Sequence, residues 1–244
     1  MDWFFTEKAG EKGDLHLITG EDAVHITKSL RMSVGEVIAL CDRQKKEHLC
    51  KIEKIDSNGV LVRITSKEDC THEPTIRLTL YFALTKGDKP ETVIQKCIEL
   101  GVSEIVPVLT DRCVSRPDAR SAEKKLARYR KIALQAAMQS RRGIVPDVRP
   151  LTDIKTAAKG LGEYDKIILF YEGGGRSLRE LITPEDKNIA VWIGPEGGFE
   201  EREVELLCSC GAQTATLGKR ILRAETAPIA AAAAIMFHTG NMEL

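Results

Sequence analysis

Hydrophobic and polar positions follow two different rhythms along this chain, and the change falls near residue 73. In the first part, short apolar runs follow one another closely between turn residues, which is typical of β-strands. The expected strands are 2–5, 15–19, 36–41, 47–55 and 60–64, and the expected helix is 21–30. Asn58-Gly59 predicts a tight hairpin, since both residue types tolerate a positive φ. Residues 1–73 are therefore predicted to form a small β-barrel domain.

After residue 73, strand-like runs alternate with longer amphipathic helices. The expected strands are 76–84, 104–109, 166–171, 189–193 and 214–217. The expected helices are 90–100, 121–140, 200–210 and 228–237, the second of them beginning at Ser121. Such alternation predicts a parallel sheet covered by helices, so residues 74–244 are assigned to one α/β domain.

Two polar turns, each directly after an apolar run, are the most informative segments of the second domain. The first is Gly194-Pro195-Glu196-Gly197-Gly198, and the second runs from Leu217 to Ala227. Glycine and proline fix such turns, and the unpaired N–H groups of the helix that follows are available to a polar ligand. Lying side by side, the turns would form a pocket walled by backbone.

Composition and motifs limit the ligands, partners and cellular location that can be expected. Lys+Arg and Asp+Glu both total 36 in 244 residues, so the net charge does not indicate a nucleic-acid partner. Seven cysteines without the spacing of a zinc site are expected to be free thiols, and no metal is expected. Gly173-Gly174-Gly175 lacks the dinucleotide fingerprint, which disfavours NAD and, with no P-loop present, ATP. Without a leader or a membrane-length apolar run, a cytoplasmic location is expected.

Together the two turns resemble the signature of the SPOUT methyltransferases, and within them the RsmE type. Three more segments are similar to that type and stand in its order: 86–89, 95–104 and 136–142. Residues 25–31 and Gly35-Glu36 resemble its amino-terminal module, so the resemblance covers essentially the whole chain. Val24 replaces a usual second histidine, and Ala224 replaces a common threonine, which removes a hydroxyl from the expected pocket.

The resemblance implies an α/β fold with a deep trefoil knot in the carboxyl-terminal domain, preceded by a PUA-like RNA-binding β-barrel. It implies methylation of N3 of a uridine in 16S ribosomal RNA of the small ribosomal subunit, with S-adenosyl-L-methionine as methyl donor. The knotted loops would be 170–174, 194–198 and 217–227. The residues then expected to bind the cofactor are Phe170, Tyr171, Glu172, Ile193, Gly194, Pro195, Glu196, Gly197, Gly198, Leu217, Gly218, Ile221, Leu222, Thr226 and Ala227.

The chemistry of this reaction selects two further residues. Uracil N3 is a poor nucleophile while it is protonated, and loss of the proton spreads negative charge onto O2 and O4. A guanidinium group can stabilise that charge, and Arg223 is the candidate. Glu225 could accept the proton if partial burial raises its pKa, although a carboxylate that faces the dipole of the following helix is an equal interpretation.

Positive charge is concentrated in 112–149, where eleven lysines and arginines face three acidic residues, an excess of eight. Some of these residues are expected to lie on a solvated helix surface and others to contact phosphate. The residues expected to bind RNA are Lys28, Arg31, Arg112, Arg116, Gln139, Arg141 and Arg142.

The helix expected at 228–237 is uncharged and apolar around nearly its whole circumference, which predicts either a core helix or an interface. The resemblance favours a homodimer through the carboxyl-terminal domain. Two other functions stay open: a SPOUT methyltransferase that acts on another RNA nucleotide, and a noncatalytic RNA-binding ribosome-assembly factor. The intact turns disfavour the second of these.

Overall fold

The computed structural model describes residues 1–7, 9, 14–42 and 44–243, which form two compact units. The first unit comprises Met1–Glu73 and Ala137–Val145, and the second comprises Pro74–Ala136 and Pro146–Leu244. The segment 137–145 thus joins the first unit, in contrast to the continuous domain 74–244 expected from the sequence. Tertiary contacts account for this, because Trp3 Nε1 donates a hydrogen bond to the Arg142 carbonyl at 3.1 Å and Met138 packs against the core of the first unit.

The first unit is built on a five-stranded sheet with the order β1-β3-β4-β5-β2. The strands are β1 (Trp3–Thr6), β2 (Leu15–Ile18), β3 (Val37–Asp42), β4 (Lys46–Asp56) and β5 (Gly59–Asp69). The five expected strands are confirmed, and Gly59 in the predicted hairpin has a φ of +136°. The edge strands approach each other where Thr6 Oγ1 lies 3.3 Å from His16 Nε2, so the sheet curls in the manner of a barrel.

A short helix covers the core of this curled sheet. The segment expected as one helix consists of α1 (Gly20–Val24) and a π-helical turn, η1 (His25–Ser29). Ala23 and Ile26 are its buried side chains, and they pack in one cluster with Phe4 and other apolar residues of the sheet.

The second unit contains a parallel sheet with the order β12-β10-β11-β6-β7-β8, and β9 also pairs with β7. Its strands are β6 (Arg77–Ala83), β7 (Glu104–Leu109), β8 (Asp147–Val148), β9 (Thr152–Asp153), β10 (Lys166–Phe170), β11 (Asn188–Ile193) and β12 (Gln213–Ala215). The predicted parallel sheet is confirmed. The very short strands β8 and β9 were not expected from the sequence.

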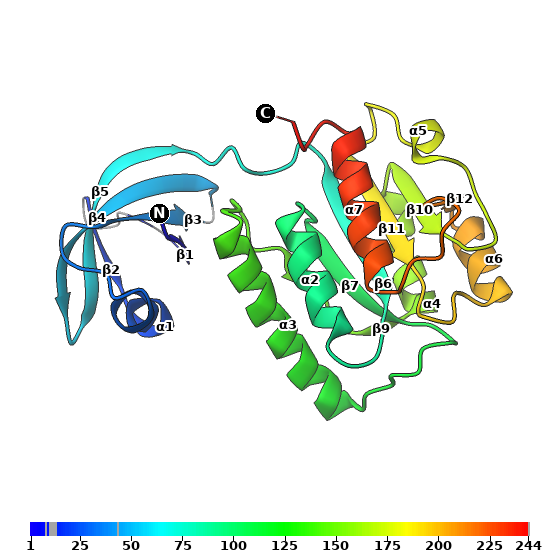
Figure 1. Ribbon diagram of the computed structural model, residues 1–244, viewed down its shortest axis with the longest axis horizontal. Coiled ribbons are helices and arrows are strands. Elements are labelled where there is room, and N and C mark those ends of the chain that lie inside the picture. The colour runs from blue at the N-terminus through cyan, green and yellow to red at the C-terminus, as the bar shows by residue number, and fades with distance from the viewer. Residues whose placement is uncertain (8, 10–13, 43, 244) are drawn as a thin grey trace. The chain divides into compact units, whose positions relative to one another are not determined.

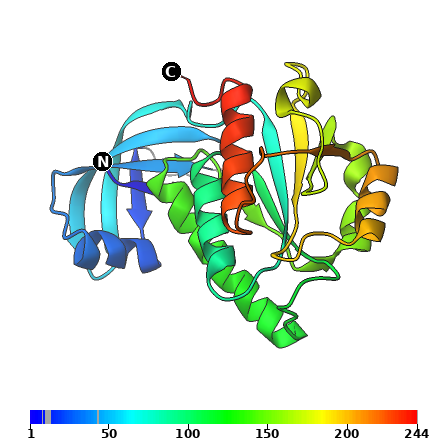
Figure 2. The same cartoon turned by 45° about the vertical axis from the view of Figure 1, so that its right-hand side comes forward.

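Helices cover both faces of this sheet, with α2 and α7 on one face and α4 and α6 on the other (Figures 1 and 2). The helical elements are α2 (Lys89–Glu99), α3 (Ala119–Gln139), α4 (Ile154–Ala158), η2 (Leu161–Glu163), α5 (Leu178–Leu181), α6 (Glu201–Ser209) and α7 (Thr226–His238). On the α4 and α6 face, the rings of Tyr81 and Trp192 stack with their centroids 4.3 Å apart. On the other face, α2 buries Val93 and Cys97, as the spacing of its apolar positions predicts.

The beginning of α3 differs from the expected one. The helix starts at Ala119, and the carboxylate of Asp118 accepts a hydrogen bond from the Ser121 amide at 2.7 Å. These hydrogen bonds from Ser121 lower the pKa of Asp118. Asp118 therefore caps the helix in place of Ser121, since a carboxylate just before the first turn satisfies amides that have no partner inside the helix.

All seven cysteines are free. Among the described residues, no helix combines the length and the apolar character needed to cross a membrane.

Candidate functional site

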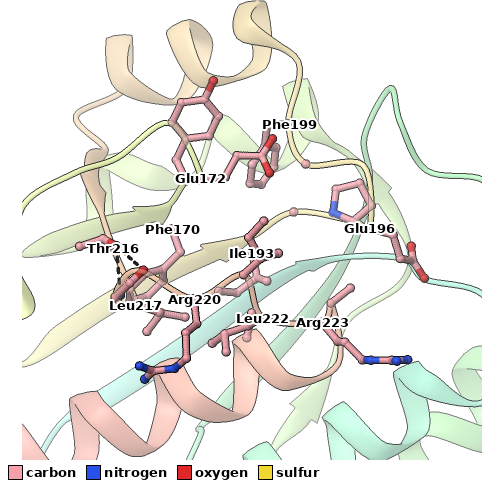
Figure 3. Close-up of a pocket in the computed structure, with 18 of the residues that line it drawn as sticks. Phe170, Glu172, Ile193, Glu196, Phe199, Thr216, Leu217, Arg220, Leu222 and Arg223 are labelled. Atoms are coloured by element: carbon pink, nitrogen blue, oxygen red, sulfur yellow. Dashed lines mark hydrogen bonds between the residues drawn. The ribbon is translucent and has the colours of Figure 1, made fainter.

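A cavity of about 570 Å³ opens at the carboxyl ends of β10, β11 and β12. Its walls come from the segments that follow these strands, with Lys89 from α2 and Ala227 from α7. Figure 3 shows Phe170, Ile193 and Leu222 at its centre. Ligands of open α/β folds bind at this edge of the sheet, and pockets for small molecules have volumes of about 300–1,000 Å³.

Most residues that the sequence assigns to the cofactor line this cavity, and two do not. Gly197 and Thr226 are the exceptions among the fifteen, and Arg223 also lies in the lining. The sequence analysis missed six lining residues: Lys89, Phe199, Ala215, Thr216, Lys219 and Arg220. Thr216, Lys219 and Arg220 belong to or adjoin the second turn, so their position in the sequence was an available signal.

The first turn depends on glycine at one position in particular. Gly198 has a φ of +70°, and a β-carbon there would lie 3.0 Å from Glu172 Oε1. Its amide donates to the Pro195 carbonyl at 2.9 Å, which closes the turn. At Gly197 a β-carbon would meet only the side chain of Arg112, at 3.4 Å. The conformation of the turn therefore requires glycine at 198 much more than at 197.

Arg112 holds the same turn from outside the cavity. Its guanidinium group donates from NH1 to the Gly197 carbonyl at 2.6 Å and from Nε to Glu200 Oε1 at 2.8 Å. Glu200 and Glu203 form a capping box at the start of α6. Arg112 is thus engaged with the turn and with the helix that follows it.

The second turn is closed by Thr216. Its hydroxyl and the Gly218 amide lie 3.1 Å apart, as the dashed lines in Figure 3 mark, and Gly218 has a φ of +98°. Five residues later the chain turns into α7, where the amides of Thr226 and Ala227 donate to the Arg223 carbonyl, each at 2.9 Å. These bonds fix both ends of the segment that carries Arg220 and Arg223.

A third segment crosses near the end of β12. The Arg176 amide donates to the Thr214 carbonyl at 3.0 Å, and Arg176 pairs with Ala215 in parallel. A β-carbon at Gly175 would lie 2.5 Å from the backbone of Thr214 and Ala215. The chain therefore needs glycine at 175 to approach β12 this closely.

Lys89 and two glutamates form the charged group of the site. Lys89 Nζ lies 2.9 Å from Glu196 Oε1 and 3.4 Å from Glu225 Oε2. The hydrogen bond to Glu196 raises the pKa of Lys89. The sequence analysis made a proton-accepting role of Glu225 depend on partial burial. The Glu225 side chain is 24% exposed, and it is paired with the Lys89 ammonium. No group of described His, Cys, Asp and Glu residues is arranged to hold a metal ion.

The residues expected to bind RNA fall into two sets. Lys28, Arg31, Gln139 and Arg141 belong to the first unit and are exposed. The two segments that carry them meet in one core cluster, which includes Leu30, Met32 and Met138. Arg112 and Arg116 belong to the second unit, where Arg116 NH2 donates to the Thr110 carbonyl at 2.7 Å.

Arg142 does not lie where an RNA contact would need it. The residue is only 2% exposed, and its guanidinium group donates from Nε and NH2 to the two carboxylate oxygens of Glu73, at 2.8 and 2.9 Å. The count of basic residues could not distinguish this buried arginine from its exposed neighbour Arg141. Arg142 is therefore corrected from an RNA-contacting to a buried structural residue.

Comparison with known proteins agrees with the geometry of the site. The RNA methyltransferase domain family matches residues 71–236, and the RNA methyltransferase PUA domain family matches residues 18–65. The chain is 33% identical over 241 residues to the ribosomal RNA small subunit methyltransferase E of Bacillus subtilis (strain 168), which covers 96% of this chain and 94% of the relative. The protein of the same name from Mesomycoplasma hyopneumoniae (strain 232) is 32% identical over 227 residues, covering 93% and 95%.

A solved structure is similar over nearly its whole length. The ribosomal RNA small subunit methyltransferase E of Neisseria gonorrhoeae, bound to S-adenosyl methionine, matches with a TM-score of 0.87 and 32% identity, covering 97% of each chain. The matched domains follow the order of the two units, with the PUA domain first. The chain belongs to the ribosomal RNA small subunit methyltransferase E family.

Proposed function

We propose that this chain methylates N3 of one specific uridine in 16S ribosomal RNA. Methylation of small-subunit ribosomal RNA with S-adenosyl-L-methionine as donor follows from the family. The choice of uridine N3 is the finer assignment, which the resemblance of the two turns implies. The observation that carries the proposal is the cavity, where both turns and the strand end at Phe170 come together. Work on the small ribosomal subunit would place the protein in the cytoplasm.

The cavity suits an adenosyl ligand. Ile193, Leu217 and Leu222 provide apolar walls, and the backbone of the two turns provides hydrogen-bonding edges for an adenine base. A side chain at 198 would meet the Glu172 carboxylate, so the glycine keeps this space open beside a polar group. Gly197 and Thr226 lie outside the lining, and we assign them to the support of the turns.

Methyl transfer to uracil N3 requires residues that accept the N3 proton and that stabilise the negative charge left on the base. When bound, S-adenosyl-L-methionine supplies an electrophilic methyl group on a sulfonium. Arg223 lines the cavity and forms no ion pair with any described residue, so its guanidinium is available to stabilise negative charge on uracil O2 and O4. Glu225 lies two residues further on, and it would accept the N3 proton directly or through water.

We also infer a trefoil knot in the carboxyl-terminal part of the chain. β12 pairs with β10 on one side and with Arg176 on the other, although Arg176 follows β10 after only a short link. The residues between β10 and Arg176 must therefore pass around the carboxyl end of β12. This enclosure is what a threaded chain needs, and knots are otherwise essentially absent from folded proteins.

For RNA, we assign the contacts foremost to Lys28, Arg31, Gln139 and Arg141, which are exposed on neighbouring segments of the first unit. Arg112 and Arg116 remain candidates with part of their hydrogen-bonding capacity in use. Phosphate contacts position RNA and make its binding dependent on salt.

The proposal includes a homodimer through the second unit. One face of α7 is buried, with Ala231, Ala232, Ile235 and Met236, while Phe237 is 63% exposed. Ile221, which belongs to the second turn and lines the cavity, is 94% exposed. Exposed apolar side chains of this size favour an interface, and a two-fold pair would cover both copies alike.

Nucleotide mapping tests the proposed reaction. Small-subunit RNA from a strain that lacks this protein is incubated with the protein and labelled S-adenosyl-L-methionine, and nuclease fragments are analysed by mass spectrometry. We expect one uridine to gain a methyl group on N3, and Arg223→Ala to reduce the rate by about 10²-fold or more while the protein stays folded. A methyl group on another base or on a ribose would show that the assignment to uridine N3 is wrong.

A further inference from the structure

The strand order of the second unit reverses between β6 and β11. The chain continues from β6 to β7 and β8 on one side, while β11, β10 and β12 occupy the other side. The two strands are parallel neighbours, with Phe82 opposite Ile193 near their carboxyl ends. The connections that leave such a pair diverge, and ligands bind in the crevice between them. Here one connection leads to α2 and the other is the first glycine turn.

Lys89 spans this crevice. It is the first residue of α2, and it contacts Glu196 of the glycine turn and Glu225, the residue before α7. Lys89, Glu196 and Arg223 all line the cofactor cavity. A single ammonium group therefore joins the start of α2, the first glycine turn and the segment before α7. Neither contact was expected from the sequence.

The two carboxylates depend on this cation. The side chains of Glu196 and Glu225 are 38% and 24% exposed, so water screens their repulsion only in part. Burial acts to raise the pKa of Glu196, but the hydrogen bond and charge of Lys89, together with the backbone amides of Glu196 and Lys86, lower it overall. The backbone amides of Glu196 and Lys86 also act on the Glu196 carboxylate, and Arg223 lines the same cavity. Without Lys89, two partly buried negative charges would face each other.

We propose that Lys89 is a positioning residue for methyl transfer: it holds Glu196 and Glu225 in alignment, and through Glu225 it fixes the segment that carries Arg223. The link from Glu225 to Arg223 is short, because the amides of Thr226 and Ala227, which directly follow Glu225, donate to the Arg223 carbonyl. The kinetic consequence of the inference rests on the proposed function. Its electrostatic consequence can be measured without RNA.

The kinetic test compares three full-length variants. Lys89→Met removes the ammonium and keeps an unbranched stem, and Lys89→Arg keeps a cation. Lys96→Met is the matched control, because Lys96 lies on the same helix and pairs with Glu99 at 2.9 Å outside the cavity. We expect Lys89→Met to lower kcat at least about tenfold, with a change in KM for S-adenosyl-L-methionine below about threefold. The acid limb of its pH profile should move to higher pH, because Glu196 loses the hydrogen bond that helps to lower its pKa, and Lys89→Arg should reverse both effects in part.

The second test measures unfolding by urea as a function of pH. A lowered pKa of Glu196 contributes stability that is present above the unfolded value of about 4.3 and is lost as the pH falls through the folded value. In Lys89→Met the stability lost as the pH falls through and below about 4.3 should therefore shrink, whereas Lys96→Met should keep it. A folded Lys89→Met chain with an unchanged pH profile and an unchanged pH dependence of unfolding would overturn the proposal. A parent chain that methylates no uridine N3 would overturn the proposed function instead, and the unfolding comparison would still decide on Lys89.

Discussion

Arg142 and Glu73 form a two-pronged ion pair inside the first unit, with donor to acceptor distances of 2.8 and 2.9 Å. The Arg142 side chain is 3% exposed and that of Glu73 is 13% exposed. Glu73 Oε1 also accepts a hydrogen bond from the Gly143 amide at 2.8 Å. The pair thus attaches segment 137–145 to the end of the strand-rich region. Each of the two buried charges is compensated by the other.

Arg142→Ala should accordingly act on stability. Removal of one partner leaves the Glu73 carboxylate buried without its cation, which costs about 3–5 kcal/mol of unfolding free energy. Urea unfolding of the full-length chain measures this loss, and Arg141→Ala is the control because that residue is exposed. Equal stabilities of the two variants would show that the ion pair contributes little.

Arg141→Ala should act on RNA binding instead. Its side chain is exposed in the first unit, on the segment beside the one that carries Arg31. Loss of one phosphate contact should weaken binding and reduce the slope of log K against log salt concentration by about one unit. Lys159→Ala, at the end of α4 in the second unit, serves as a control of equal charge change. An unchanged slope for Arg141→Ala would assign this residue to the solvated surface.

The contrast between these neighbouring arginines shows what the sequence can predict. Long elements such as α2 and β11 carry several periods of their apolar pattern, so the sequence located them within one or two residues. The two-residue strand β8 and the four-residue helix α5 carry no full pattern and were missed. The sequence also did not predict that residues 137–145 leave the second unit and join the first, because this depends on tertiary contacts.

The same limit applies to the candidate site. The two turns were predicted because glycine and proline determine local conformation. The Lys89–Glu196 pair was not, because its partners lie 107 residues apart and only the fold brings them together. Arg112 was predicted to bind RNA because of its charge. Its hydrogen bond to the Gly197 carbonyl was not predicted, because that contact also depends on the fold.

Gly198→Val should impair cofactor binding more than Gly197→Ala. At 198 the new side chain would adopt a positive φ that β-branched residues avoid, and its β-carbon would lie 3.0 Å from Glu172 Oε1. At 197 the added methyl meets Arg112 carbons at an ordinary 3.4 Å. Calorimetry with S-adenosyl-L-methionine should show at least about a tenfold loss of affinity for Gly198→Val and little change for Gly197→Ala. Unchanged affinity in a folded Gly198→Val chain would mean that the ligand does not depend on this turn.

Asp42 should contribute to acid stability in the first unit. Burial acts to raise its pKa, but hydrogen bonds from His48 and from the amides of Lys46 and Gln44 lower it overall. The unfolded chain therefore takes up the proton first, and stability should fall as the pH drops below about 4 and passes through the folded pKa. Asp42→Asn should lower stability at neutral pH and flatten this acid dependence in urea titrations. Asp69→Asn, at an exposed carboxylate, should preserve the dependence; if Asp42→Asn preserves it as well, the His48 contact has no linkage to acid unfolding.

The proposed homodimer predicts that two impaired chains can complement each other. Ile221 leaves apolar surface at the cavity and Phe237 leaves it near the carboxyl end of α7, and a two-fold pair through α7 would cover such surface in both copies. If the RNA surface of one chain serves the cavity of the other, a Gly198→Val chain retains an RNA surface and an Arg141→Ala chain retains a cofactor site. Their heterodimer should then contain one complete site and recover up to about half of the parent activity per dimer. Light scattering at micromolar concentration establishes the assembly, and mixed refolding with two affinity tags isolates the heterodimer. A fully active monomer would eliminate the dimer, whereas a confirmed heterodimer without activity would argue only against a site shared between the chains.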